Sequence, residues 1–307
     1  MRYFLSILLT ILPLYSQIKA YQLTSENMLH VNKQKITILD AKELFFHDKH
    51  GIAFHEISDI TFVNGYFYFI SDQGYLYKFF IKIKENKIKN VQYLDAYILK
   101  NKKMQQLRKK ERDAEGLTSY YGNLLISFER KQRVSLYATN AIEIKKIDIN
   151  KDLKKKSHYF SKNKGLEAVA YNEKYGVITA PELPLQTTSG KYHTLYSKKS
   201  IFRFINSGES IVSFVFSDED TLLVLLRDFN YLTRRRVTTL MKVYLDTCNV
   251  LRVCKNEILA KLDSADGWRL DNFEGLTRVD KNKYLMVSDD NGNILQKTLL
   301  VLFAIKD

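Results

Sequence analysis

Two short apolar runs on either side of a polar turn recur along the chain. The second run of each pair is rich in β-branched and aromatic residues, which favour β-strands. Two such runs around a tight turn predict an antiparallel β-hairpin. The four clearest copies cover residues 55–74, 113–130, 165–182 and 271–291. A fifth, degenerate copy covers residues 210–229.

Each of the four clear copies begins with a Glu and ends with an acidic residue. The opening residues are Glu56, Glu115, Glu167 and Glu274, and the closing residues are Asp72, Glu129, Glu182 and Asp289. The two acids of a copy are 16, 14, 15 and 15 residues apart. Because antiparallel pairing returns the second strand to the start of the first, the two acids should lie side by side. Acids that merely flank strands would not explain so regular a spacing.

Many short strands with turns between them are typical of a sandwich, a barrel or a propeller. The repeated hairpin favours an all-β fold with a single β-propeller of about six blades, with five as the alternative. Residues 21–307 are assigned to this one domain. The last strand, within residues 296–305, is expected to pair with residues 35–40 and close the ring. The best helical candidate is the short, basic segment 100–112.

The first 20 residues predict a signal peptide that would export the chain to the periplasm or beyond the cell. Arg2 precedes an apolar stretch that is too short to span a bilayer, and Ala20 could be the cleavage residue. Cleavage after Ser16 and an uncleaved anchor are the alternatives. In an oxidising compartment Cys248 and Cys254, six positions apart, predict a local disulfide rather than two free thiols.

The formal net charge of +14 means that the surface attracts anionic partners, although it says nothing about the fold. Basic residues cluster at 78–112 and 234–236, but aromatic residues are not regularly interleaved with them. No nucleic-acid-binding motif is present, so we expect no nucleic-acid partner. No later apolar run reaches transmembrane length. The mature chain is therefore predicted to lack a transmembrane segment and to act as a monomer.

Several segments resemble the phytase-like family, which is described as having the esterase-like activity of phytase. They are DAEGL with SFER, GLEAVA with APE, LLVLLRDF, and the C-terminal block DNFEGL, SDDN and QKTLLVLF. The resemblance implies a β-propeller, an exported location and the hydrolysis of phosphate esters or other esters. It carries over no catalytic residues, which remain unknown at this stage.

Carboxylates gathered at one mouth of a propeller repel one another, and their desolvation adds to the cost. A hard divalent cation such as Ca²⁺ would relieve this repulsion. The candidate metal ligands are Glu56, Asp72, Glu115, Glu129, Glu167, Glu182, Glu274, Asp289 and Asp290. The candidate substrate-binding residues are Arg227, Asn272 and Asn291. The alternative is a structural rim in which the carboxylates accept backbone N–H groups or pair with Arg227, which takes the closing position in the fifth copy.

These residues predict a metal-assisted hydrolase that acts on a small anionic or ester substrate at the channel mouth. A serine nucleophile has little support because no G-x-S-x-G motif is present. The alternative function is a non-catalytic propeller of the cell envelope that binds a ligand or a protein partner.

Overall fold

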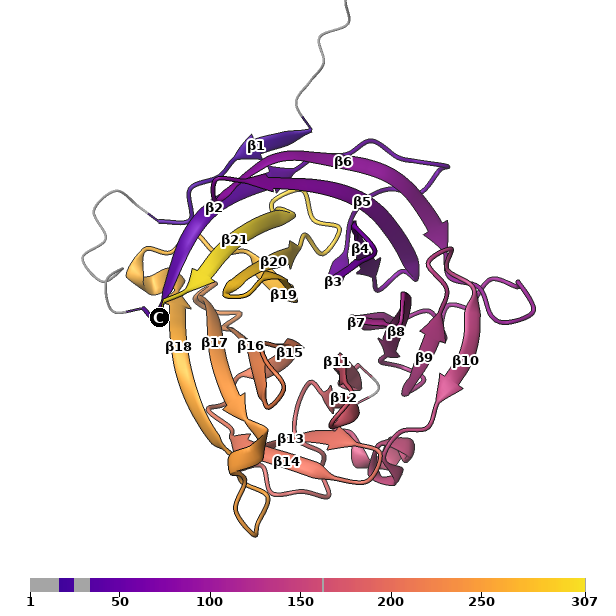
Figure 1. Ribbon diagram of the computed structural model, residues 1–307, viewed down its shortest axis with the longest axis vertical. Coiled ribbons are helices and arrows are strands. Elements are labelled where there is room, and N and C mark those ends of the chain that lie inside the picture. The colour runs from indigo at the N-terminus through magenta and orange to yellow at the C-terminus, as the bar shows by residue number, and fades with distance from the viewer. Residues whose placement is uncertain (1–16, 25–33, 162, 307) are drawn as a thin grey trace, which may run out of the picture.

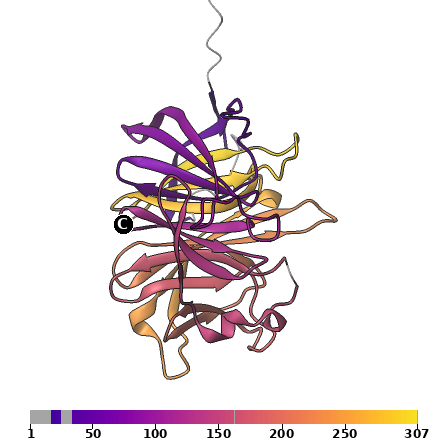
Figure 2. The same ribbon diagram turned by 90° about the vertical axis from the view of Figure 1, so that its right-hand side faces the viewer.

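In the computed structural model, which describes residues 17–24, 34–161 and 163–306, the chain folds into five antiparallel sheets around a central axis (Figures 1 and 2). The predicted all-β propeller is confirmed, and the described residues form five blades. Their only helices are single 3₁₀ turns. These are η2 (Lys151–Lys154), η3 (Lys156–His158), η4 (Leu245–Thr247) and η5 (Ser264–Asp266).

Four blades are four-stranded meanders built from consecutive strands. The first contains β3 (Ile57–Val63), β4 (Tyr66–Ser71), β5 (Tyr75–Lys84) and β6 (Lys87–Ile98). The second contains β7 (Ala114–Tyr120), β8 (Asn123–Phe128), β9 (Arg133–Tyr137) and β10 (Glu143–Ile147). The third contains β11 (Leu166–Asn172), β12 (Gly176–Pro181), β13 (Tyr192–Ser197) and β14 (Ile201–Ile205). The fourth contains β15 (Ser210–Phe216), β16 (Thr221–Phe229), β17 (Arg236–Tyr244) and β18 (Lys255–Asp263).

The fifth blade joins the two ends of the chain. Its order is β1–β2–β21–β20–β19. Its strands are β1 (Ile18–Ala20), β2 (Ile36–Leu44), β19 (Asn272–Asp280), β20 (Lys283–Asp289) and β21 (Leu299–Ile305). The pairing of β2 with β21 confirms the predicted closure of the ring, and Figure 1 shows the indigo strand beside the yellow one. Most of the predicted signal peptide, residues 1–16, lies outside the described residues, and cleavage after Ala20 would remove β1.

Apolar side chains from both faces of each blade pack against the neighbouring blades. Residues 222–226 of β16 are all completely buried, because adjacent blades cover both faces of this strand. A single large cluster joins the fourth and fifth blades and includes Leu223, Trp268 and Phe303. Four further clusters lie between the other pairs of adjacent blades, so the core is spread around the ring.

The chain makes five blades because its outer strands and connections use many residues. β5 and β6 have 10 and 12 residues, and the segment 99–113 joins the first two blades without a strand of its own. The helix predicted within this segment is wrong. Its backbone pairs with the next blade instead, since the N–H of Glu143 donates to the carbonyl oxygen of Lys100 at 2.9 Å.

Buried Asp59 lies where the inner strands meet. Its carboxylate accepts hydrogen bonds from the N–H of Ile60 at 2.8 Å, of Leu117 at 2.7 Å and of Leu276 at 3.0 Å. It also accepts one from the Ser213 hydroxyl at 3.1 Å. These donors belong to β3, β7, β19 and β15. One carboxylate thus holds four of the five inner strands together.

The close approach of the inner strands explains the glycine that follows Glu in two of the repeats. A Cβ atom at Gly275 would lie 2.7 Å from the Cα of Asp59, and one at Gly116 would lie 2.3 Å from the carbonyl oxygen of Glu167. Neither contact can be relieved without moving the backbone. Glycine is therefore required so that the acidic residues before it can gather around one axis.

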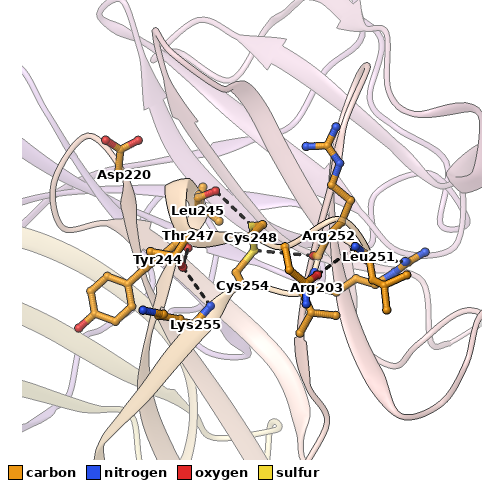
Figure 3. Close-up of a disulfide and its surroundings, with 12 residues drawn as sticks. Arg203, Asp220, Tyr244, Leu245, Thr247, Cys248, Leu251, Arg252, Cys254 and Lys255 are labelled. Atoms are coloured by element: carbon orange, nitrogen blue, oxygen red, sulfur yellow. Dashed lines mark hydrogen bonds between the residues drawn. A yellow bond between two sulfur atoms is a disulfide. The ribbon is translucent and has the colours of Figure 1, made fainter.

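Cys248 and Cys254 are joined by a disulfide in the loop between β17 and β18 (Figure 3). The enclosed loop also pairs with β14 of the adjacent blade. The N–H of Arg203 donates to the carbonyl oxygen of Arg252 at 2.7 Å, and the N–H of Cys254 donates to that of Arg203 at 2.8 Å. The disulfide loop therefore ties the outer strands of two blades together.

Candidate functional site

Strand register places one residue of each blade at an equivalent position at or near the end of the second strand from the axis. In the pairs that adjoin the register shift of each inner strand, the second strands contribute Ser71, Phe128, Pro181, Leu226 and Ser288, which face Ile57, Ala114, Leu166, Ile211 and Phe273. The next residues in the chain are Asp72, Glu129, Glu182, Arg227 and Asp289. Four carboxylates and one guanidinium therefore occupy the same position in the five blades.

The inner strands supply a second set of equivalent positions, each one residue after the inner member of those pairs. These positions are Ser58, Glu115, Glu167, Val212 and Glu274. Glu56 does not belong to this set, because Ser58 takes its place two residues later. The 16-residue spacing of the first repeat is longer than the others for this reason.

All members of the two sets except Val212 line a small cavity of about 200 Å³, which we call the acidic mouth. Its lining residues are Ser58, Asp72, Glu115, Glu129, Asn163, Lys164, Glu167, Glu182, Arg227, Glu274, Asp289 and Asn291. Seven of the nine predicted acidic ligands are among them. Glu56 and Asp290 do not line the cavity. They contact each other instead, and the backbone N–H of Glu56 donates to the carboxylate of Asp290 at 3.0 Å. Asn272 lies beside the cavity and donates to Glu274 at 2.8 Å.

Two cations face the seven carboxylates of the acidic mouth. Arg227 pairs with Glu274 and lies 3.9 Å from Glu182. Lys164 pairs with Glu182 at 2.6 Å. The repeat pattern predicts Arg227 but not Lys164, because Lys164 lies just before Gly165, where the third repeat begins. The carboxyl groups that line the cavity still outnumber its cations by seven to two.

Burial beside other carboxyl groups raises the pKa values of several acids of the acidic mouth. It raises the pKa of Glu115 well above its ordinary value, and the neighbouring Glu167 adds to the rise. The pKa of Glu167 is raised in the same way by burial and by Glu182. Burial and a contact with Asp113 raise the pKa of Glu129. Burial, followed by the charge of Glu56, raises the pKa of Asp72 to about 6.

Two overlapping groups of these carboxylates have the spacing of a metal site. The oxygens of Asp113, Glu115 and Glu129 lie within 4.8 Å of one another, and so do those of Glu129, Glu167 and Glu182. Carboxylate oxygens are ligands that suit a hard cation. The Oδ1 atom of Asp72 is buried and has no hydrogen-bond donor among the described residues. This donor set fits Ca²⁺ or a similar divalent cation.

Without a divalent cation, the protein is expected to lose thermal stability as the pH rises from about 4 to about 7. The pKa values of Asp72 and Glu129 are raised in the folded chain. The folded state therefore binds more protons than the unfolded state in this range, and deprotonation favours unfolding. Melting temperatures measured in chelator across the range test this. The variant Glu129→Gln should show a shallower decline, and an equally steep decline in both proteins would contradict the assignment.

A sequence model of the family described as "Phytase-like: Esterase-like activity of phytase" matches residues 52–292. The chain belongs to the phytase-like family. The matched region begins before β3 and ends just after β20, so it contains all the residues that line the acidic mouth of this phytase-like chain. A comparison with curated proteins gives no match.

Solved structures that resemble the phytase-like chain share little sequence with it. One is a chain of "Crystal Structure of Mitotic Checkpoint Complex", with 9% identity, a TM-score of 0.40, and coverage of 87% of this chain and 72% of that chain. A second is from "COPII on membranes, outer coat vertex", with 8% identity, a TM-score of 0.41, and coverage of 82% and 62%. A third, "Structure of Dos1 propeller", has 8% identity, a TM-score of 0.35, and coverage of 87% and 74%. Among the described residues of our chain, no helix could span a membrane.

Proposed function

We propose that the acidic mouth binds a divalent cation such as Ca²⁺ and hydrolyses a phosphate ester or another ester. The observation that carries this proposal is the convergence of seven carboxylates and two cations on one cavity. Membership of the phytase-like family supports hydrolysis of an ester bond. The negative charge left over after the Arg227 and Lys164 pairs favours a cation.

Glu129 is the residue most central to the proposed cation site, because it belongs to both groups of closely spaced carboxylates. Asp113 and Glu115 would complete one site, and Glu167 and Glu182 the other. A bound cation would polarise an ester oxygen and make a bound water more acidic. The carboxyl groups would release their protons when it binds, so its affinity should increase with pH.

Other residues of the acidic mouth would bind substrate and move protons. Asp72, whose pKa is raised to about 6, can accept a proton at neutral pH and serve as a general base. Its Oδ1 atom has no donor among the described residues, so it is free to bind water. Arg227 is held by Glu274 and Asn272 and faces the cavity. Asn163 and Asn291 can orient a polar substrate by hydrogen bonds.

The Cys248–Cys254 disulfide fits an oxidising compartment, so we further propose that the protein acts outside the cytoplasm. This agrees with the predicted signal peptide.

Hydrolysis of phosphate monoesters, phosphate diesters and carboxylic esters, each measured with chelator and after restoring Ca²⁺, tests the proposed function. We expect activity towards one class that chelator removes and Ca²⁺ restores. Activity that persists in chelator would contradict a metal-assisted reaction. Binding of a ligand or an envelope protein without any turnover would support the non-catalytic alternative instead.

A further inference from the structure

A second, larger cavity adjoins the acidic mouth and is lined by cations. It has a volume of about 660 Å³, and its lining residues include Lys110, Arg130, Lys131, Lys156 and Asn163. Asn163 lines the acidic mouth as well, so the two cavities are neighbours. No carboxylate is among the described residues that line this second cavity. We call it the basic cavity.

Three separate segments bring these cations together. Arg130 and Lys131 form the turn between β8 and β9, directly after Glu129 of the acidic mouth. Lys156 begins η3, and Lys110 lies in the connection that leads to β7. Their convergence is a product of the folded blades, since 46 residues separate Lys110 from Lys156.

Two of the four cations have no partner of their own. Arg130 pairs with Asp113 at 2.9 Å, and Lys131 pairs with Glu111 at 2.5 Å. The ammonium groups of Lys110 and Lys156 have no ion-pair or hydrogen-bond partner in the part of the chain that the structure describes. Both side chains are exposed. They are free to bind an anion without breaking an existing pair.

A neighbouring cavity provides a contrast. It has a volume of about 740 Å³ and shares Lys131 and Lys156 with the basic cavity, but Glu111, Glu143 and Asp148 also line it. Its carboxylates would repel an anion. The basic cavity is different because its charged lining residues are all positive, so an anion there would relieve their mutual repulsion.

The chemistry of the cavity favours a tetrahedral oxyanion such as a phosphate or sulfate group. Lysine ammonium groups bind such oxygens as point charges, and the fork of an arginine can add a second contact. The hydroxyl of Tyr159, another lining residue, already donates to the carbonyl oxygen of Leu153 at 2.8 Å. Because this hydroxyl is already bonded, Tyr159 would contact the organic part of the ligand with its ring and would not hydrogen-bond to the anionic group.

We propose that the basic cavity is a subsite for a phosphate or sulfate group that is not itself cleaved. The same substrate would place its scissile ester in the acidic mouth. This link to a substrate rests on the proposed function, whereas anion binding by the cavity does not. The subsite also explains how a cavity rich in carboxylates can receive a substrate that carries negative charge, because the neighbouring cations offset the repulsion.

Calorimetric titration of metal-free protein with pyrophosphate and, separately, with sulfate tests the subsite. The double variant Lys110→Gln/Lys156→Gln should bind at least about tenfold more weakly than the unmodified chain. The matched control is Lys82→Gln/Lys199→Gln, which removes the same charge at two exposed positions outside the basic cavity and should bind like the unmodified chain. Equal weakening in the two variants would overturn the proposal. Binding of both probes assigns a general oxyanion site, and binding of pyrophosphate alone assigns a phosphate site.

Failure of the subsite and failure of the proposed function give different results. Glu129→Gln should retain anion binding, because it removes negative charge beside the basic cavity, while it abolishes hydrolysis. If the unmodified chain has no hydrolytic activity and yet Lys110→Gln/Lys156→Gln loses anion binding, the subsite stands without the enzyme. If the chain is active but this variant binds pyrophosphate and sulfate normally, the subsite is wrong and the hydrolase stands.

Discussion

Replacing Glu129 with Gln is expected to lower the kcat/KM of ester hydrolysis by at least about a hundredfold and to abolish divalent-cation binding. Glu129 contributes an oxygen to both closely spaced carboxylate groups, so its loss disrupts either arrangement of the cation. Gln has nearly the same shape and removes only the charge. Burial raises the pKa of Glu129, so a neutral side chain is already compatible with the fold. The melting temperature in chelator should therefore not fall.

The control for this variant is Glu219→Gln, which removes an exposed carboxylate outside the acidic mouth. It should leave hydrolysis and cation binding unchanged. Steady-state kinetics on the substrate class found for the unmodified protein measure both variants. Full activity in Glu129→Gln would show that the acidic mouth is a structural rim rather than a hydrolytic site.

Replacing Asp59 with Ala is expected to lower the free energy of unfolding by about 4 kcal/mol. The substitution leaves three backbone N–H groups and the Ser213 hydroxyl without their acceptor at the centre of the ring. These groups belong to four inner strands, so the substitution weakens the contacts between blades. Burial raises the pKa of Asp59 to about 8, against the effect of its hydrogen bonds. Denaturant unfolding measures the loss.

The matched control for this prediction is Ser213→Ala. It removes one of the four donors and leaves the carboxylate and its backbone contacts in place. We expect a loss of about 1 kcal/mol. If the two variants had equal stabilities, Asp59 would not be the residue that holds the inner strands together.

The ring and much of its acidic mouth could be predicted from the sequence because both depend on hairpin pairing. An antiparallel pair fixes which residue faces which, so a regular spacing of acids implies a shared position in space. The same logic placed Arg227 at the closing position of the degenerate repeat, and strand register puts it there. Closure by the last strand followed from the need to cover sheet edges.

The opening residue of the first repeat could not be aligned by spacing alone. Glu56 and Ser58 are both polar residues just before an apolar run, and only strand register distinguishes them. Register shifts in each inner strand, of the kind that β-bulges produce, change the spacing by a residue or two without a clear mark in the sequence. The sequence of one chain therefore predicts that acidic residues line the channel mouth, but it does not identify each of these residues correctly.

The roles of Asp59 and of the basic cavity depend on contacts between blades. Local sequence patterns do not predict such contacts. In sequence Asp59 is one acid inside a strand, and Lys110 is one of many lysines. Only the closed ring places Asp59 among four inner strands and brings Lys110 close to Lys156. The number of blades was uncertain for a similar reason, since the lengths of outer strands and connections vary.

Equilibrium dialysis of metal-free protein against Ca²⁺ at neutral pH, followed by elemental analysis, measures whether the acidic mouth binds a cation. We expect saturable binding of about one cation per chain, as for a compact carboxylate site. Glu129→Gln should lose this binding and Glu219→Gln should retain it. Equal cation binding in all three proteins, or none in any of them, would contradict the claim that the acidic mouth is a metal centre.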